Sequence, residues 1–459
     1  MAFWQNVLTD RIVGAVGASS PGTGFTSVAN FPTLVGNART QKLPLYLLPG
    51  TYPSTQLSIT SGNPLVLSAE KGTATIQFSG GSDNLFFIQN VSDCKLQGLL
   101  INGNNATFTN PGQLTALVNI QGSGVAACII SDCTIYNSTH CGISCSGNAY
   151  TSMINNLIYS CDAGIWSIDG TVYINKNTVQ YCNNNGILVQ ASTATNVNGS
   201  EVSSNYISDI SNASGGSGQY GNGINVFRAG GVKILNNTIY RCNYTSIRIN
   251  IAGNCQVIGN HCSVASGDVA IYFEAPGPGG GGTTLIGGIF ANNIVDTATT
   301  GISIANSGLY DDGVTRRITI SGNQVTNVTS YGIQVEGSCD VVGNIVETAS
   351  IGIVLGTNDA TKDLVASGNY VTSCNMGIGY SANAAAKNIL VSSNLVTNYV
   401  TNSNPAAPGY ARSGAIVSVS YATSPGYTRD SVSGAANTDH GNDTHTVVGS
   451  LTVGMNRAG

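Results

Sequence analysis

The sequence predicts an all-β fold, a single-stranded right-handed parallel β-helix with an N-terminal cap and a short C-terminal tail. One phrase recurs, in which Gly-Asn or Asn-Asn precedes a short apolar run and then Gly-Ile, as in ISGNQVTNVTSYGIQV at 320–335. Within each unit apolar residues alternate at a period of two, as at Ile247 and Ile249, and never at the helical period. Gly or Asn punctuates the units every few residues, which keeps each strand short.

One asparagine in each repeat marks the coil. These landmark asparagines are Asn156, Asn177, Asn205, Asn237, Asn260, Asn293, Asn323, Asn344, Asn369 and Asn394. Their separations are 21, 28, 32, 23, 33, 30, 21, 25 and 25 residues, so a coil needs about 21 and the excess forms loops. Each coil is expected to hold three short strands and to stack on the next at about 4.8 Å. A leucine-rich repeat is excluded because LxxLxLxxN does not occur, and a propeller because it would need longer blades with hairpin turns.

The composition excludes several classes of protein. Only 8% of the residues are charged, 42% are hydrophobic and the net charge is -5, so the chain is neither disordered nor a nucleic-acid binder. No run approaches the roughly 20 apolar residues of a membrane span. The first residues, MAFWQNVLTDRIVGAVGASS, show neither a signal peptide nor a twin-arginine pair, so synthesis without an export signal is expected.

Three segments of the chain differ in sequence pattern and composition. Residues 1–40 lack a regular pattern and are expected to form an N-terminal anchor or cap, with the cap near 25–38. Residues 41–420 form the predicted β-helix, and 41–93 are its first coils. Residues 421–459 are rich in Ser, Thr and Asp and include the strand-like run HTVVGSLTV, which favours a C-terminal cap or an assembly element.

The twelve cysteines are interpreted as core residues and not as a disulfide framework. Cys161, Cys182, Cys242 and Cys374 each follow a landmark asparagine by five residues, where other coils carry small apolar residues. That position is expected to point inward, so these thiols should stack from coil to coil.

The landmark asparagines are expected to be structural. An amide at the same turn of every coil can donate to one neighbouring coil and accept from the other. Such a ladder would satisfy backbone groups that a tight turn leaves unpaired, which favours a structural role over ligand binding.

No metal or other cofactor is predicted. The spacing of Cys133, His140, Cys141 and Cys145 fits no standard zinc pattern, and Cys145 lies in the inward register. His261 follows a landmark asparagine, and the other three histidines are expected outside the repeated strands. A histidine-based catalytic arrangement is therefore not predicted.

Two columns of side chains are expected to face solvent, because strand residues alternate between the two faces. The first column holds Trp166, Leu188, Asn225, Arg248, Tyr272, Ser303 and Gln334. The second holds Ile168, Gln190, Phe227, Asn250, Glu274, Ala305 and Glu336. Insertions at 211–222 and 275–283 flank the middle of these columns and are expected to wall a groove.

This groove suits a sugar polymer, whose rings stack on aromatic side chains and whose hydroxyls need dense hydrogen bonding. The predicted substrate-binding residues are Trp166, Gln219, Tyr220, Asn225, Asn250 and Tyr272. The predicted catalytic residues are Arg248, Glu274 and Glu336.

Two reactions stay open at the groove. Glu274 and Glu336 share one column two coils apart, about 9.6 Å at the backbone, which allows an inverting hydrolase. A lyase would instead use Tyr272 as the base beside Arg248. The charged loop 306–317 could join either reaction. The alternative without chemistry is a surface ion pair between Arg248 and Glu274.

The stretch GGSGQYGNGINVFRAGGVKILNN at 215–237, with IRINIAGNCQVIGN at 247–260 and VAIYFE at 269–274, resembles a family of bacterial twin-arginine-translocated right-handed β-helix repeat proteins. The resemblance runs from LYLLPGTY at 45–52 to about residue 400. The resemblance implies the fold and a function outside the cytoplasm, and it implies no particular reaction. Because the twin-arginine signal is missing here, a phage tail or capsid spike is the competing interpretation.

Three functions follow as hypotheses. The first is a virion-type or surface-displayed spike that binds, and in its active form depolymerises, bacterial surface polysaccharide. The second is a secreted or periplasmic polysaccharide lyase or hydrolase, and the third is a structural stalk or decoration protein. The first places the protein on a virion or cell surface, and the second places it in the periplasm or outside the cell.

Polysaccharide and further copies of the chain are the predicted partners. A homo-oligomer, a trimer first, is expected because outward Ile168, Leu188 and Phe227 would expose more apolar surface than a groove needs. A partner protein docked on the N-terminus is expected for a spike or stalk. Neither nucleic acid nor a membrane span is predicted.

Overall fold

The structure of the protein is a computed structural model. It divides the chain into two compact units, residues 1–193 with 198–225 and residues 194–197 with 226–459. The residues it describes are 12–14, 31–81, 83–108, 114–122, 127–147, 150–195, 198–213, 220–264, 269–274, 287–305, 317–336, 338–356, 362–381, 387–398, 414–419 and 446–448.

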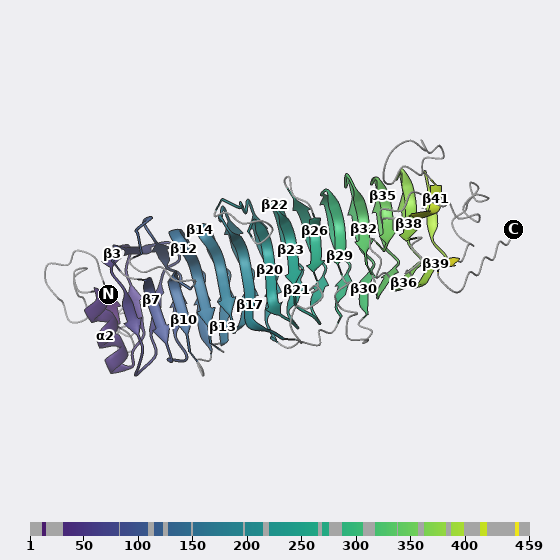
Figure 1. The fold of residues 1–459 in the computed structure, drawn as a ribbon. Coiled ribbons are helices and arrows are strands. Elements are labelled where there is room, and N and C mark those ends of the chain that lie inside the picture. Colours follow the sequence, from purple (N-terminus) through teal and green to yellow (C-terminus); the bar gives the residue numbers. More distant parts are fainter. Residues whose placement is uncertain are drawn as a thin grey trace, which may run out of the picture. The chain divides into compact units, whose positions relative to one another are not determined.

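The predicted fold class is confirmed, because each unit is built from parallel strands that pair with the strands one coil before and one coil after (Figure 1). In the first unit one ladder runs through β1 (Ile12–Gly14), β2 (Leu45–Leu47), β5 (Val66–Ala69), β8 (Lys95–Gln97), β11 (Cys128–Ser131), β13 (Tyr150–Ile154), β15 (Thr171–Asn175) and β18 (Glu201–Ser203). The remaining strands of that unit are β3 (Gly50–Ser54), β4 (Leu57–Ile59), β6 (Ala74–Phe78), β7 (Asn84–Gln89), β9 (Leu100–Asn102), β10 (Ala116–Gln121), β12 (Thr134–Ser146), β14 (Leu157–Ile168), β16 (Thr178–Gln180), β17 (Asn185–Thr195), β19 (Tyr206–Ser208) and the start of β20 (Asn222–Ala229).

In the second unit every coil contributes one strand to each of three ladders. The first ladder is β21 (Lys233–Leu235), β24 (Gln256–Ile258), β27 (Ile289–Ala291), β30 (Ile318–Ser321), β33 (Cys339–Val342), β36 (Lys362–Ser367) and β39 (Lys387–Ser392). The second is β22 (Thr238–Cys242), β25 (His261–Val264), β28 (Ile294–Thr297), β31 (Gln324–Thr326), β34 (Ile345–Glu347), β37 (Tyr370–Thr372) and β40 (Leu395–Thr397). The third is β23 (Thr245–Asn250), β26 (Val269–Glu274), β29 (Thr300–Ala305), β32 (Tyr331–Val335), β35 (Ile351–Leu355), β38 (Met376–Ser381) and β41 (Gly414–Val419).

The landmark asparagines form the predicted ladder inside each unit. In the second unit the backbone N–H and the Nδ2 of Asn260 both donate to Oδ1 of Asn293, at 3.0 Å each, and Asn293 donates in the same way to Asn323 at 2.9 Å. Nδ2 of Asn293 also donates to the Val257 carbonyl at 2.9 Å. All ten asparagines are at most 1% exposed, so the structural prediction is confirmed.

The backbone conformation of the residue before each landmark asparagine accounts for the Gly-Asn and Asn-Asn motif. All ten of these residues have positive φ, near +55° at Asn155, Asn236 and Asn292 and near +64° at Gly322 and Gly343. Glycine and asparagine tolerate this left-handed conformation best. The positive φ of the turn therefore favours Gly or Asn before the ladder position, and the hydrogen bonds of the ladder require asparagine at that position.

The core follows the predicted alternation. The inward positions hold stacks of Ile, Val and Cys, and Cys161, Cys182, Cys242 and Cys374 are at most 2% exposed, as is Cys145. This confirms their assignment to the core. Burial raises the pKa of the Cys145 thiol to about 11 and that of Cys161 to about 12, so these thiols stay neutral at ordinary pH.

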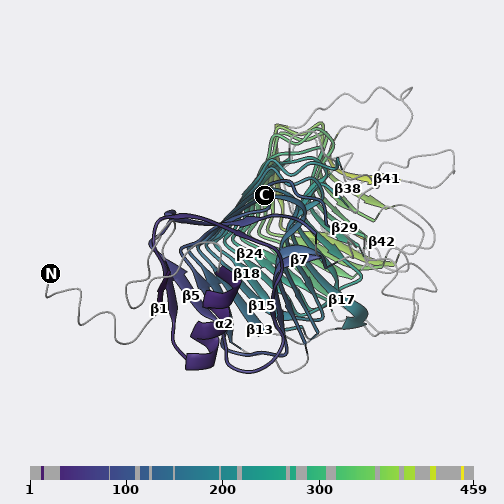
Figure 2. The same ribbon diagram turned by 90° about the vertical axis from the view of Figure 1, so that its left-hand side faces the viewer.

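A helix covers the first coils where the sequence suggested no regular structure. The helix α2 (Phe31–Gln41) buries Phe31, Leu34, Val35 and Ala38, which are spaced as one helical face. The ring of Phe31 lies 5.6 Å from that of Tyr52. Figure 2 shows α2 across the N-terminal end of the first unit's coils. The interpretation of residues 31–40 as irregular was wrong, because the helical spacing of these apolar residues was overlooked, whereas a cap near this segment is present.

At the other end, β42 (Thr446–Val448) pairs antiparallel with β39 and lies in the run predicted to be strand-like. The first eleven residues, and with them the expected docking site for a partner protein, lie outside the described part of the chain. The helix found in the described part is too short and too polar to cross a bilayer.

Candidate functional site

The third ladder of the second unit aligns four of the predicted residues. Arg248 pairs with Tyr272 and Asn250 pairs with Glu274, across β23 and β26. One coil further, Glu274 pairs with Ala305 on β29. The N–H of Glu336 donates to the Ile304 carbonyl at 3.0 Å, which places Glu336 directly after β32 and two coils from Glu274.

Arg248 is the centre of this face. Its Nη2 donates to Oε2 of Glu274 at 2.6 Å, and the side chains are 8% and 36% exposed, respectively. The guanidinium also lies 6.0 Å from the ring of Tyr244, within range of a cation–π contact. Its Nε is buried with no acceptor among the residues described. The site therefore holds a nearly buried cation whose hydrogen-bonding capacity the protein does not fully use.

Tyr272 is a neutral phenol in this setting. Burial is the main cause, and the charge of Glu274 adds to it, so the pKa of Tyr272 is raised to about 12, with a smaller contribution of the same sign from Glu336. A phenol with this pKa donates a hydrogen bond at neutral pH and does not act as a base. The lyase scheme with Tyr272 as the base is therefore disfavoured.

The raised pKa of Tyr272 predicts a pH dependence of stability. The unfolded chain loses this proton near pH 10 and the folded chain near 12, so the contribution of the buried phenol is fully present below pH 10 and falls as the pH rises toward 12. We expect the unfolding free energy of the parent, minus that of Tyr272→Phe, to fall across this window in urea titrations. A difference that stays constant from pH 8 to pH 11 would contradict the assignment.

Four of the seven residues in the first predicted column are buried rather than exposed, and Trp166, Tyr272 and Gln334 are half-buried. Leu188, Asn225, Arg248 and Ser303 are 6%, 7%, 7% and 8% exposed. Arg248 reaches from its own coil to Glu274 in the next one. Alternation decides which face a side chain is on, but not whether that face is covered.

The prediction that Leu188 contributes to an exposed apolar surface is also wrong. Neither Leu188 nor its neighbours in the prediction, Ile168 and Phe227, is fully exposed. In the described part of the chain, four of the eight exposed large apolar side chains instead follow the second ladder of the second unit. They are Ile294, Ile345, Tyr370 and Leu395, between 38% and 48% exposed, and the other four are Tyr150, Tyr181, Ile289 and Val342.

The remaining predicted binding residues belong to the first unit. Trp166 is half-buried and its Nε1 donates to Oε1 of Gln190 at 3.2 Å. Tyr220 is half-buried, Asn225 is buried, and Gln219 lies outside the described residues. These residues are therefore not assigned to the site built on β23, β26 and β32.

The expected loop contributions are mostly outside the described residues. This applies to 214–219, 275–286 and 306–316, and so to the two predicted groove walls and most of the charged loop. Arg317 is described, and its Nε and Nη2 donate to both carboxylate oxygens of Asp340, at 2.7 and 2.6 Å. Arg317 is thus engaged in a bidentate ion pair.

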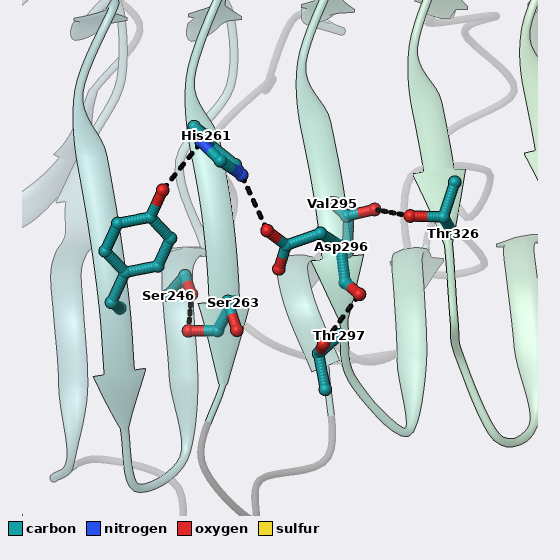
Figure 3. A network of polar contacts seen from close by, with 8 residues as sticks. Ser246, His261, Ser263, Val295, Asp296, Thr297 and Thr326 are labelled. Atoms are coloured by element: carbon teal, nitrogen blue, oxygen red, sulfur yellow. Dashed lines mark hydrogen bonds and ion pairs between the residues drawn. The ribbon is translucent and has the colours of Figure 1, made fainter.

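A second polar cluster was not predicted from the sequence. His261 on β25 lies between two strands of the same ladder, as Figure 3 shows for its contact with Asp296. Its Nδ1 is 2.7 Å from the phenol oxygen of Tyr240, and its Nε2 is 2.8 Å from Oδ2 of Asp296. The rings of Tyr240 and His261 meet edge to face, with centroids 5.1 Å apart. The sequence interpretation did not predict that His261 contacts two polar side chains, and whether a histidine takes part in catalysis stays a prediction.

Two β-bulges lie at this cluster. Between Ile239 and Cys242 the strand β22 carries one residue more than β25, and β28 carries Asp296 as an extra residue between the partners of Cys262 and Ser263. A bulge re-aims the side chain it carries. The sequence signal was a tyrosine and an aspartate each three residues after a landmark asparagine, with a histidine in the coil between them.

In the described part of the chain, His140 and the cysteines add no metal site. His140 lies within β12, not outside the strands as expected, and its ring packs edge-on against Phe108 at 5.2 Å. Burial lowers the pKa of His140. Among the described residues, no group of three or more His, Cys, Asp or Glu side chains is arranged to hold a metal ion.

Comparisons with known proteins bear on the fold. A family model described as "Right handed beta helix region" matches residues 74–220 and 207–347. No curated protein matches the chain. The match is to the broad family, and the narrower twin-arginine-translocated family stays a prediction.

Solved structures are similar at low identity. The catalytic unit of a thermostable GH87 α-1,3-glucanase from Streptomyces thermodiastaticus strain HF3-3 is 15% identical, with a TM-score of 0.53 over 77% of this chain and 69% of that one. A GH87 α-1,3-glucanase catalytic domain in complex with tetrasaccharides is 13% identical, with a TM-score of 0.57 over 78% and 69%. The Dettilon tailspike protein is 16% identical, with a TM-score of 0.42 over 83% and 66%. The two glucanase likenesses show a shared fold and nothing of the reaction.

Proposed function

The chain belongs to the right-handed β-helix family, and from this premise we propose that it binds and hydrolyses a bacterial surface polysaccharide at the face formed by Arg248, Tyr272, Glu274 and Glu336. One observation carries the proposal. A nearly buried guanidinium with an unused donor binds a carboxylate of the next coil, and on that same strand a neutral phenol is its register partner. Sugar hydroxyls supply the acceptors and donors that such a set needs.

The two carboxylates support hydrolysis over elimination. Glu274 and Glu336 are two coils apart, about 9.6 Å at the backbone, which is just above the range of about 6.5 to 9.5 Å between the carboxyl groups of inverting hydrolases. Glu274, held by Arg248, is assigned as the base that takes a proton from water. Glu336 is assigned as the acid that protonates the glycosidic oxygen as the water attacks the anomeric carbon. Tyr272 donates a hydrogen bond to the sugar.

Substitution of Glu274 tests the proposal. Glu274→Gln should reduce the release of reducing ends from a bacterial polysaccharide by a hundredfold or more, because the amide cannot accept the proton from water. The amide oxygen still accepts from Arg248, so the unfolding free energy should change by about 1 kcal/mol or less. Glu347→Gln, an exposed glutamate on β34, is the matched control and should keep full activity.

Binding is tested separately. Tyr272→Ala should weaken polysaccharide binding by about 1 to 3 kcal/mol, because a sugar ring loses its aromatic contact and a hydrogen bond. If both Glu274→Gln and Tyr272→Ala bind and react as the parent does on a polymer that the parent cleaves, this face is not the site.

Assembly and location belong to the same proposal. A polysaccharide-cleaving spike on a virion or cell surface would be a homo-oligomer, and the trimer stays the first expectation. Light scattering over a wide concentration range measures it, and a monomer throughout would contradict it.

A further inference from the structure

We propose that Tyr240, His261 and Asp296 form a second, separate catalytic site that cleaves uronate-containing sugar polymers by β-elimination, with the Tyr240 oxygen as the base. The choice of a sugar polymer as substrate rests on the proposed function above. The site itself rests on the two short contacts of His261, which lie on β22, β25 and β28 rather than on the ladder that carries Arg248.

The two hydrogen bonds of His261 define which of its ring nitrogens donates and which accepts. An ionised Asp296 can only accept, so Nε2 of His261 carries a proton and donates it to Oδ2 at 2.8 Å. In the neutral imidazole Nδ1 is then an acceptor, and the phenol of Tyr240 donates to it at 2.7 Å. A carboxylate thus orients an imidazole that can take the proton of the phenol, which is the arrangement that activates a catalytic hydroxyl.

The backbone departs from the repeat where this cluster lies. Eight coils place a residue of positive φ four positions after the landmark asparagine, and Arg241 is one of them. Val264 and Thr297, at the same position in the coils of His261 and Asp296, do not adopt that conformation. The ladder of asparagines continues unchanged through these coils. The fold therefore does not require the departure, and bulges of this kind are frequent beside active sites.

The cluster is open to solvent and adjacent to a cation. The side chains of His261 and Asp296 are 35% and 41% exposed, so a polymer can reach them. Arg241 shares the bulge with Tyr240 and is exposed. Its positive charge suits the carboxylate of a uronate, and neutralising that carboxylate makes the proton on the adjacent ring carbon more acidic.

The reaction balances without a co-reactant. The proton of Tyr240 moves to Nδ1 of His261, and the phenolate oxygen takes the C5 proton of the uronate. The electrons of the C5–H bond form a C4=C5 double bond, and the C4–O glycosidic bond breaks with its electron pair on oxygen. Tyr240 then protonates that oxygen and recovers its own proton from His261. The products are an unsaturated uronate end and a new reducing end.

Chemical labelling tests the activation of Tyr240 without any substrate. The intact protein is treated with an aryl sulfonyl fluoride, which reacts with phenolates, and labelling is followed by peptide mass spectrometry. Tyr240, although half-buried, should react about tenfold faster than Tyr181, which is 58% exposed. His261→Gln and Asp296→Asn should abolish the excess, because glutamine accepts the hydrogen bond but not the proton. Equal rates at the two tyrosines, or an excess that survives in His261→Gln, overturn the proposal.

Product analysis tests the reaction and separates it from the first site. Sodium polygalacturonate, alginate and hyaluronan are incubated with the protein, and the ultraviolet absorbance of unsaturated uronate is followed. We expect this absorbance with at least one polymer, its loss in Tyr240→Phe, and its persistence in Glu274→Gln. No absorbance with any of the three, or equal absorbance with Tyr240→Phe, overturns the elimination. Loss in Glu274→Gln together with normal labelling of Tyr240 would assign the chemistry to the first site and also overturn it.

Discussion

Replacing Cys182 with Asp should lower the unfolding free energy by more than about 4 kcal/mol. Cys182 is 0% exposed and follows Cys161 in the inward stack, where burial holds the pKa of the thiol well above its usual range. The same environment would force a carboxyl group either to ionise without a partner or to stay neutral with unpaired oxygens, and both are costly.

Urea unfolding followed by circular dichroism measures this effect. Cys182→Val is the matched control, since Val328 occupies the equivalent place five residues after Asn323 and is 3% exposed. The control should stay within about 1.5 kcal/mol of the parent. An unchanged denaturation midpoint for Cys182→Asp would remove the inward assignment.

Replacing Asn293 with Ala should cost about 3 kcal/mol or more, because three buried groups each lose a hydrogen bond at once. These are the backbone N–H of Asn260, the Nδ2 of Asn260 and the carbonyl of Val257. Asn293 is 0% exposed, so water does not replace the lost bonds without opening the coil.

The control for this ladder is an asparagine outside it. Asn254 is exposed and has a φ of +56°, a conformation that glycine adopts freely, so Asn254→Gly should change stability by less than about 1 kcal/mol. Calorimetric melting of the two variants gives the comparison. Equal, small losses for both would show that the ladder contributes little.

Part of the candidate site could be predicted from the repeat. Parallel coils stack in register, so the residues after Ile247 and Ile271 had to become neighbours, and Arg248 indeed pairs with Tyr272. The reach of Arg248 to Glu274 is a diagonal contact within that register. Its burial could not be predicted, because exposure of an outward side chain depends on what lies across the face and on how long side chains fold onto the sheet.

The sequence by itself determined the parallel β-helix, the inward cysteines and the asparagine ladder, because each depends on a spacing repeated from coil to coil. Only the tertiary structure decided the helix α2 as the cover of the first coils and the cluster of Tyr240, His261 and Asp296. A bulge adds one residue to one strand and is invisible in a pattern of alternation. Two such bulges accompany the cluster, one at Tyr240 and one at Asp296, while the asparagine ladder stays in register.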